Sequence, residues 1–328
     1  MVKLDVKDKR ILHQLDVNSR QSNAEIAKKV GLSKQVVGFR IKRLFKDEVL
    51  SSCYTVIDIA KLGLTSHKSF LRLQNINKEK QIELIEWLKN NQNVVWLASC
   101  DGKYDLIFGM QAKNIEELEK NLKEFNLKFG DYISERQIAT IIKGEYSVRD
   151  YLVDQKESKS TSKAYFGGVS TKAVIDKKDG LILFTLGKDA RTTIVEMAKI
   201  TQLSPDAVSK RLKKLEQTGV IQHYNIVPNE SSYPYLHYKI IIGLRNATET
   251  KEKALLAYCR NDKNIVYTVK ALGPWDFEID LEVKNIEDFR GIMMSLKSKF
   301  QDIIKDYSAL LIYQVHKYNF CPSIPESS

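Results

Sequence analysis

The feature that most constrains this chain is an internal duplication with an offset of 171 residues. Aligned without a gap, residues 5–50 and 176–221 share 17 identities in 46 positions. The same offset still matches Gly102 to Gly273. Solenoid repeats run over only about 20–50 residues, so this longer period indicates a duplicated pair of domains. Whatever one half of the molecule does, the whole is expected to do in pairs.

Length and composition are those of an ordinary globular protein. The 328 residues suggest two to four domains, and a hydrophobic fraction of 43% supports buried cores. No apolar run approaches the ~18 residues of a membrane span, and the N-terminus lacks the apolar region of a signal peptide. The four cysteines show no CxxC spacing, which argues against zinc ribbons and disulfide scaffolds. We therefore expect a cytoplasmic protein without a membrane partner.

The net charge of +11 is unevenly distributed along the chain. Residues 1–64 carry 13 Lys/Arg against 7 Asp/Glu, and residues 176–228 carry 9 against 6. The stretch 151–175 carries 4 against 2, whereas 65–150 and 229–328 are each neutral. Localised positive charge attracts phosphate backbones through counterion release, so nucleic acid is the leading partner. An anionic membrane surface is the weaker alternative, because neither basic segment has an aromatic-rich apolar face.

The first part of each copy has the pattern of a helix-turn-helix. A helix near Asp8–Leu15 is followed by the capping box Ser22-Asn-Ala-Glu25, which starts a second helix. Gly31 can adopt the left-handed conformation that ends this helix, and Ser33 then caps a third. Residues Val49–Ile59 are expected to form a strand, the wing that leads into the next domain.

The second part of each copy has the order strand–helix–strand–strand–helix–strand. In copy one the expected strands are 67–74, 94–100, 105–112 and 132–142, and the expected helices are 78–90 and 114–128. In copy two, residues 277–283 alternate strictly between apolar and acidic, the signature of an antiparallel strand. This order is the ferredoxin-like pattern, in which both helices cover one face of the sheet. The bare face then needs a partner.

The fold class is therefore α+β, with two winged helix-turn-helix domains and two ferredoxin-like βαββαβ domains in a tandem duplication. The expected helix-turn-helix domains are 1–64 and 176–228, and the expected ferredoxin-like domains are 65–150 and 229–328. Residues 151–175 between the copies are polar and contain Gly167-Gly168, so a flexible linker is predicted there.

In a helix-turn-helix the third helix enters the major groove, and its N-terminal turn reaches the base edges. Here Gln35 can bind adenine, Lys34 can bind guanine or phosphate, and Arg40 and Arg43 are expected to contact the DNA backbone. The expected DNA-binding residues of copy one are Ser33, Lys34, Gln35, Gly38, Phe39, Arg40, Lys42 and Arg43. The alternative is that a basic amphipathic helix is only a solvated surface. The segregated charge and the duplicated helix-turn-helix favour DNA binding.

The same helix of copy two differs at its start. Thr193-Ile-Val-Glu196 forms the preceding capping box, and Ser204-Pro205 supplies the N-cap and the first helical residue. Pro205-Asp206 replaces Lys34-Gln35, and an aspartate repels phosphate unless it accepts a hydrogen bond from a cytosine amine. The expected DNA-binding residues of copy two are Ser204, Ser209, Lys210, Arg211 and Lys213. Unequal half-sites are therefore predicted, and loss of DNA binding by the second head is the alternative.

These features resemble the Lrp/AsnC (feast/famine) family of transcription regulators. The matching residues in copy one are Leu32-Ser33, Val37, Arg40-Ile41, Leu44 and Gly102-Lys-Tyr104-Asp105. In copy two they are Leu203-Ser204, Val208, Arg211-Leu212, Leu215, Gly219-Val220-Ile221 and Gly273-Pro-Trp275-Asp276. The two-domain order, found twice, is more specific than any single motif.

The resemblance implies dimerisation through the bare sheet faces and DNA binding that is tuned by an amino acid or a related small molecule. Family members usually carry a single unit, and their dimers often assemble further. The tandem chain is accordingly expected to fold as an intramolecular pseudo-dimer, in which the linker lets the two sheets face each other.

The two Gly-x-x-Asp loops are candidates for an effector site. In that interpretation a carboxylate meets the α-amino group of the ligand, and two aromatic rings wall the pocket. The candidate effector-binding residues are Gly102, Tyr104, Asp105, Gly273, Trp275 and Asp276. The alternative is structural: each glycine makes a turn with positive φ, and each aspartate caps it.

An acidic ladder lies on one face of the copy-two sheet and consists of Asp276, Glu278, Asp280 and Glu282. A solvated face is the default expectation for such a pattern. If the two sheets face each other, these carboxylates instead need basic partners, a bound cation or an amine ligand, because unpaired buried charges are costly.

Enzymatic chemistry finds little support in the sequence. The histidines show no metal-ligand spacing and are His13, His67, His223, His237 and His316. No phosphate loop or dinucleotide fingerprint occurs, and no nucleophile–base pair can be named. We expect no catalytic residue, no metal and no cofactor. The alternative is a tetrapyrrole (siroheme-type) decarboxylase, because some of these enzymes resemble Lrp/AsnC proteins; it would need His and Arg around its substrate in the sheet domains.

Overall fold

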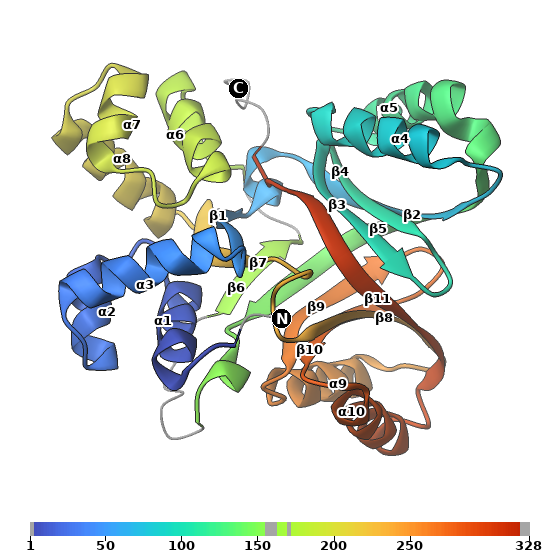
Figure 1. Ribbon diagram of the computed structural model, residues 1–328. Coiled ribbons are helices and arrows are strands. Elements are labelled where there is room, and N and C mark those ends of the chain that lie inside the picture. Colours follow the sequence, from blue (N-terminus) through green and yellow to red (C-terminus); the bar gives the residue numbers. More distant parts are fainter. Residues whose placement is uncertain (1–2, 155–162, 169–171, 322–328) are drawn as a thin grey trace.

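The structure is a computed structural model that describes residues 3–154, 163–168 and 172–321 (Figure 1). Within these ranges, no helix is both long enough and apolar enough to cross a membrane. The chain forms two helical heads on one side and a large sheet structure on the other.

Both predicted helix-turn-helix units are confirmed. Ser22 and Glu25 close a reciprocal capping box at the start of the second helix, and the Ser33 hydroxyl accepts a hydrogen bond from the backbone N–H of Val36 at the start of the third. Equivalent caps occur in copy two. The helices are α1 (Val6–Val17), α2 (Asn23–Val30) and α3 (Lys34–Lys46) in copy one, and α6 (Lys177–Lys188), α7 (Ile194–Thr201) and α8 (Pro205–Gln217) in copy two.

The strand expected as a wing is present after each head, and its partner is the equivalent strand of the other copy. β1 (Leu50–Ile57) pairs antiparallel with β7 (Ile221–Pro228) in a separate two-stranded sheet. The register centres on the pair Tyr54 and Asn225, which occupy the same position in the two copies. A pseudo-two-fold axis therefore passes between these two residues and relates one head to the other.

Side chains reinforce the pairing of the heads. Arg20 donates to the carbonyl oxygens of Ala190 and Thr192 at 2.5 and 2.8 Å. Its equivalent, Arg191, donates in return to the carbonyls of Ser19 and Gln21. Apolar residues from both heads also form one continuous core, which includes Ile11, Leu12, Val37, Ile182, Leu183 and Val208. The two heads are therefore one packed unit rather than two separate domains.

Each sheet domain has the predicted βαββαβ order. Copy one contains β2 (Thr65–Leu73), α4 (Lys78–Asn90), β3 (Val94–Asp101), β4 (Leu106–Ala112), α5 (Ile115–Phe129) and β5 (Ile133–Ser147). Copy two contains β8 (Leu236–Leu244), α9 (Glu249–Arg260), β9 (Ile265–Leu272), β10 (Phe277–Val283), α10 (Ile286–Lys299) and β11 (Ile304–Tyr318). The apolar residues of β10 pack in the core beneath α9 and α10, as the alternation predicts.

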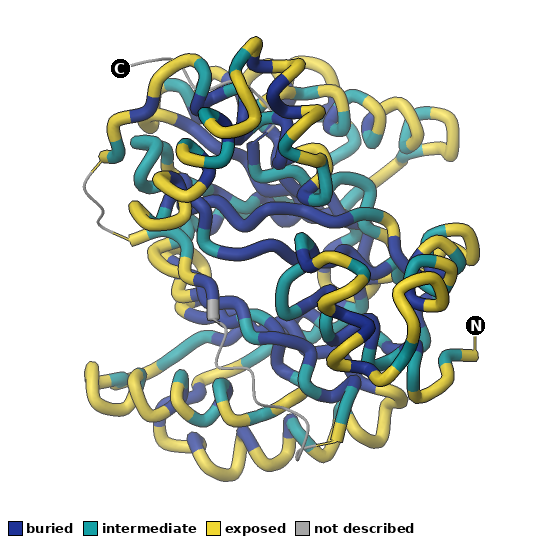
Figure 2. Tube along the Cα trace, turned by 90° about the vertical axis from the view of Figure 1, so that its left-hand side faces the viewer, coloured by how far each residue is buried: buried dark blue, intermediate teal, exposed yellow. Residues whose placement is uncertain are grey.

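The two sheets join edge to edge and close into a barrel. β5 pairs with β2 through its first half and with β9 through its second half, and β11 pairs in the equivalent way with β8 and then β3. The strand order β2-β4-β3-β11-β8-β10-β9-β5 closes because β2 also pairs with β5. The faces that were predicted to need a partner point into this barrel, and the helices cover its outside. Figure 2 shows the buried strands running through the middle of the molecule, between exposed helices.

Part of the predicted linker has regular structure. The short helix η3 (Asp150–Leu152) follows β5, and β6 (Lys163–Gly167) pairs antiparallel with the end of β5. The expectation of a structureless segment does not hold for these residues, while 155–162 and 169–171 lie outside the described residues. Two further short helices are η1 (Ile59–Leu62) and η2 (Gly130–Tyr132).

Gly102 offers a test of how closely the barrel closes at the seam between β3 and β11. It has a φ of +130°, and a Cβ added there would lie 2.9 Å from the carbonyl oxygen of Ala309. We expect Gly102→Ala to lower the free energy of unfolding by about 1–3 kcal/mol, the usual cost of a strained backbone position, in a denaturant titration. Gly130→Ala is the control, because nothing lies within 4 Å of its added Cβ. Equal effects of the two changes would contradict the close approach at this seam.

Candidate functional site

The outward face of α3 is open to solvent. The inward residues of this helix are Val37, Ile41 and Leu44. Lys34, Gln35, Phe39 and Lys42 are exposed, and Phe39 keeps 67% of its surface accessible. Donors and an aromatic ring on the N-terminal half of a recognition helix are suited to contacts with base edges and phosphates.

Arg40 and Arg43 are engaged inside the head. Arg40 forms ion pairs with Asp5 at 2.7 Å and with Asp8 at 2.8 Å, and Arg43 pairs with Asp8 at 2.6 Å. The same arrangement recurs in copy two among Arg211, Asp176 and Asp179, with both contacts at 2.7 Å. These pairs tie the recognition helix to the start of the first helix. The arginines therefore orient the helix, and a contact of theirs with the DNA backbone stays a prediction.

Two other predicted DNA-binding residues also have local structural roles. The hydroxyl of Ser33 caps α3, and that of Ser204 caps α8 by accepting from the backbone N–H of Ala207. Gly38 lies against α2, where an added Cβ would come within 3.0 Å of the Asn23 side-chain amide nitrogen. Close approach to DNA by Gly38 stays a prediction beside this packing role.

The two recognition helices differ in the groups they expose. The start of α8 presents Pro205 and Asp206, whereas copy one has Lys34 and Gln35 at the same positions. Lys210 and Lys213 are exposed, and Ser209 is half-buried. The inequality predicted between the two heads therefore concerns solvent-accessible groups.

The Gly-x-x-Asp loops lie at the two seams of the barrel. A Cβ on Gly102 or Gly273 would come within 2.9 or 2.7 Å of a carbonyl oxygen on the strand across the seam. The carboxylates of Asp105 and Asp276 each accept a hydrogen bond of 2.7 Å from the backbone N–H at the end of a neighbouring strand. The turn-and-cap alternative accounts for all four residues.

The aromatic residues of these loops point into the barrel. Tyr104 and Trp275 are buried with ring centroids 6.4 Å apart, and Phe70 lies between the two halves against both rings. They fill the end of the barrel as core side chains. An effector site at the loops stays a prediction, and the cavity described below is lined by other residues.

The acidic ladder is buried inside the barrel, where basic groups accompany it. Glu278 lies 2.5 Å from Lys68 of copy one, and Asp280 lies 2.7 Å from Lys239. Asp276 is different, because it is exposed at the strand end. The default expectation of a solvated face is therefore wrong for the rest of the ladder. The basic partners expected for facing sheets are present instead.

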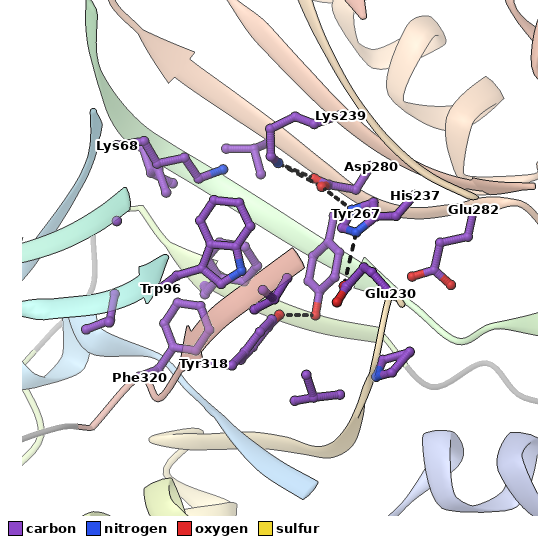
Figure 3. Close-up of a pocket in the computed structure, with 18 of the residues that line it drawn as sticks. Lys68, Trp96, Glu230, His237, Lys239, Tyr267, Asp280, Glu282, Tyr318 and Phe320 are labelled. Carbon is purple, nitrogen blue, oxygen red and sulfur yellow. Dashed lines mark hydrogen bonds and ion pairs between the residues drawn. The ribbon is translucent and has the colours of Figure 1, made fainter. Parts of the chain in front are cut away.

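His237 is held between Asp280 and Glu230 (Figure 3). Its Nε2 lies 2.9 Å from an oxygen of Asp280, and its Nδ1 lies 3.6 Å from an oxygen of Glu230. Burial disfavours the imidazolium, but the interactions with the two carboxylates outweigh burial and raise the pKa of His237 to about 9. The ring is therefore protonated at neutral pH.

Arg149 joins the first head to the barrel. Its buried guanidinium lies 2.9 Å from Glu282 on β10 and 2.7 Å from Asp16 at the end of α1. Tyr146 donates its hydroxyl proton to Asp16, and Tyr151 donates to Glu282. Burial alone would lower the pKa of Arg149, but the two carboxylates hold it well above its usual value. The network is thus a charged contact between a DNA-binding-type head and the sheet of the other copy.

A cavity lies between this network and the pseudo-two-fold axis. One lobe encloses about 750 Å³ and reaches Trp96 and Glu230, and the other encloses about 960 Å³ and reaches Tyr54. The aromatic residues that line both lobes are Phe166, Tyr267, Tyr318 and Phe320. In the view of Figure 3, Trp96, Phe320 and Tyr318 stand on one side of the pocket, and the charged groups around Glu230 stand on the other.

Sequence reasoning missed most residues of this cavity. Lys68, Lys239 and Arg149 were not among the candidates, and His237 was considered only as a metal ligand. One signal was available: Lys68 and Lys239 occupy the same position in the two copies, in the middle of otherwise apolar strands. Across the ranges that the structure describes, no group of three or more potential metal ligands occurs.

Two family models match the chain, one in each helix-turn-helix. An AsnC-type helix-turn-helix domain matches residues 4–44. A winged helix-turn-helix DNA-binding domain matches residues 175–222.

The curated relatives are single-unit proteins or parts of them. The HTH-type transcriptional regulator LrpA of Pyrococcus abyssi is 45% identical over 62 residues, which is 19% of this chain and 44% of that protein. The regulator FL11 of Pyrococcus furiosus is 25% identical over 148 residues, 44% of this chain and 94% of that protein. An uncharacterised HTH-type transcriptional regulator of Pyrococcus horikoshii is 30% identical over 124 residues, 38% of this chain and 82% of that protein.

Solved structures with the whole tandem arrangement also match. The siroheme decarboxylase NirDL superposes with a TM-score of 0.61 over 98% of this chain and 94% of that chain, at 13% sequence identity. The same enzyme with an iron-uroporphyrin III analogue gives a TM-score of 0.60 at 13% identity, over 99% of this chain and 95% of that chain. At this identity the likeness shows the fold alone.

Removing Arg149 tests whether the buried network holds head and barrel together. We expect Arg149→Met to lower the free energy of unfolding by about 3–5 kcal/mol, because two buried carboxylates lose their counter-charge. Denaturant unfolding measures the loss, and adding Asp16→Asn and Glu282→Gln to Arg149→Met should recover much of it. Arg72→Met, at an exposed position, is the control and should change stability by less than about 0.5 kcal/mol. Similar losses for Arg149→Met and Arg72→Met would refute this role.

The protonated His237 makes stability depend on pH. Its pKa in the folded protein is raised from 6.5 to about 9, so its contribution is complete below about pH 6.5 and is lost as pH rises through about 9. We expect the free energy of unfolding to fall over this range in the wild type, and to fall less in His237→Gln. Identical pH profiles for the two proteins would be inconsistent with a charged His237.

Proposed function

The chain belongs to the Lrp/AsnC family as a tandem duplicate, and we propose that it is a transcription regulator that binds specific double-stranded DNA sites. A single chain supplies both helix-turn-helix heads and so acts as a covalent pseudo-dimer. The double-stranded DNA is its macromolecular partner in this proposal.

One observation carries the proposal: the two heads are locked to each other around a pseudo-two-fold axis while the outer face of α3 stays open. The β1–β7 pairing and the reciprocal contacts of Arg20 and Arg191 hold the heads together. Dimeric helix-turn-helix proteins need such a fixed separation, because their recognition helices must meet half-sites at set spacings along the duplex. A lone basic surface helix needs no such arrangement.

The second candidate is a siroheme-type decarboxylase, favoured by the full-length likeness to NirDL. Iron tetrapyrroles of this class are polycarboxylates, so their site needs uncommitted cations. The cations at the cavity are instead engaged with internal carboxylates: Lys68 with Glu278, Lys239 and His237 with Asp280, and Arg149 with Asp16 and Glu282. The donor set therefore fits a tetrapyrrole poorly, and the regulator is the better-supported function.

An amino acid or related small molecule that tunes DNA binding belongs to the proposal as well. The support is family membership together with two sensor-type sheet domains per chain. Addition of single amino acids to the binding assay described next tests this part, through a change in affinity at fixed salt.

The proposal is tested by measuring affinity for the gene's own upstream DNA and for a random duplex across a range of salt concentrations. Fluorescence anisotropy should show tighter binding upstream and a linear fall of log affinity with log salt, because bound phosphates release counterions. An absorbance scan of the purified protein accompanies it. Weak, salt-insensitive binding together with a tetrapyrrole absorbance band would favour the decarboxylase.

The two heads should contribute unequally to this binding. We expect Lys34→Ala/Lys42→Ala to flatten the slope of log affinity against log salt by up to about 1.8, since each lost phosphate contact removes about 0.9. Lys210→Ala/Lys213→Ala should flatten it less, because Asp206 already weakens phosphate binding at the second head.

Lys120→Ala/Lys123→Ala, on the exposed side of α5, is the matched control for lost charge and should leave both slope and affinity unchanged. Equal losses for the two heads would remove the case for unequal half-sites. Equal losses for all three double variants would show that only general charge matters.

A further inference from the structure

The ionised groups at the barrel cavity do not balance. Counting the lining and the carboxylates directly behind it, the acids are Asp16, Glu230, Glu278, Asp280 and Glu282, and the bases are Lys68, Arg149, His237 and Lys239. Five negative charges therefore face four positive ones when His237 is protonated. A ligand with a positive charge would balance the set, whereas an anion would add to the excess.

Glu230 is the carboxylate that has room for such a ligand. Glu278, Asp280, Glu282 and Asp16 each have a basic group within 3.0 Å. Among the described residues, the nearest ionic partner of Glu230 is His237 at 3.6 Å, beyond hydrogen-bond distance. Its side chain is 12% exposed and lines the cavity. A buried carboxylate with free acceptor positions favours a ligand that donates hydrogen bonds.

The opposite wall of the cavity is aromatic. Trp96 and Phe320 line the lobe that contains Glu230, and Tyr318 makes a T-shaped contact with Phe320 at 5.4 Å between ring centroids. Aromatic walls with a few convergent polar groups are the usual make-up of small-molecule sites, and ring faces also attract cations. Figure 3 shows this wall and Glu230 on opposite sides of the pocket.

The cavity is also asymmetric, although the barrel around it is not. The copy-one counterpart of Glu230 is Ile59, and that of Asp280 is Gly109, which lines the cavity without a side chain. The pseudo-two-fold axis therefore does not generate a second copy of the charged wall. One site per chain follows from this difference.

We propose that this cavity binds one small planar aromatic amine, with its ring against Trp96, Tyr318 and Phe320 and its ammonium group on Glu230. Neutral aromatic compounds bind more weakly, and aromatic carboxylates bind least. The site lies inside the barrel, away from the Gly-x-x-Asp loops, and it stands or falls independently of DNA binding.

Three probes with the same ring and different charge test the proposal: tryptamine, indole and indole-3-acetate. Isothermal titration calorimetry on the intact chain without DNA should give one site per chain for tryptamine. Its affinity should exceed that of indole by about tenfold, the gain expected from one hydrogen bond to a charged group. Indole-3-acetate should bind more weakly than indole. Tighter binding of indole-3-acetate than of tryptamine would overturn the proposal.

Glu230→Gln identifies the carboxylate that recognises the amine. It should bring the affinity for tryptamine down to that for indole while leaving indole binding within about twofold, since the aromatic wall is intact. Glu124→Gln, an exposed change on α5, is the control and should leave the tenfold preference in place. A preference that survives Glu230→Gln in a folded protein, verified by circular dichroism, would place the amine elsewhere and refute the proposed site.

Discussion

The guanidinium of Arg149, buried between Asp16 and Glu282, is the contact on which the arrangement of heads and barrel depends. Asp16 ends the first helix of head one, whereas Glu282 lies on the copy-two strand β10. One side chain after β5 therefore holds together a head, a sheet of the same copy and a sheet of the other copy. Buried ion pairs add little net stability over apolar packing, but the loss of one partner is costly. The network thus disfavours other ways of docking the heads, and specificity of the arrangement is its main effect.

The duplication has kept its symmetry where the copies touch and lost it where the barrel is hollow. The reciprocal contacts of Arg20 and Arg191 and the paired seams at Gly102 and Gly273 are preserved in both halves. Inside, the copy-two equivalent of Arg149 is Phe320, and that of Asp16 is Gly187. A symmetric frame suits two half-sites on a duplex. An asymmetric interior suits a single ligand, and it ties only head one to the barrel through a buried charge.

How far the sequence predicts this structure depends on whether the signal is local. The capping residues Ser22, Glu25 and Ser33 act within one turn of helix, and the alternation over 277–283 acts within one strand, so these elements are predicted correctly. Closure of the barrel depends on β5 and β11 being long enough to pair with two strands each, which no local pattern reveals. Arg149 is a single basic residue after a strand. Its partners lie 133 positions away on either side, so only the assembled fold can assign its role.

The most direct test of the central claim is the number of chains bound to a duplex selected from a random pool. Mass photometry of the complex, combined with a footprint of the selected DNA, measures both the stoichiometry and the half-sites. The account predicts one chain of 37.7 kDa across two unequal half-sites on one face of the duplex. Full affinity for a single half-site, or an obligatory second chain to occupy the two half-sites, would contradict the covalent pseudo-dimer.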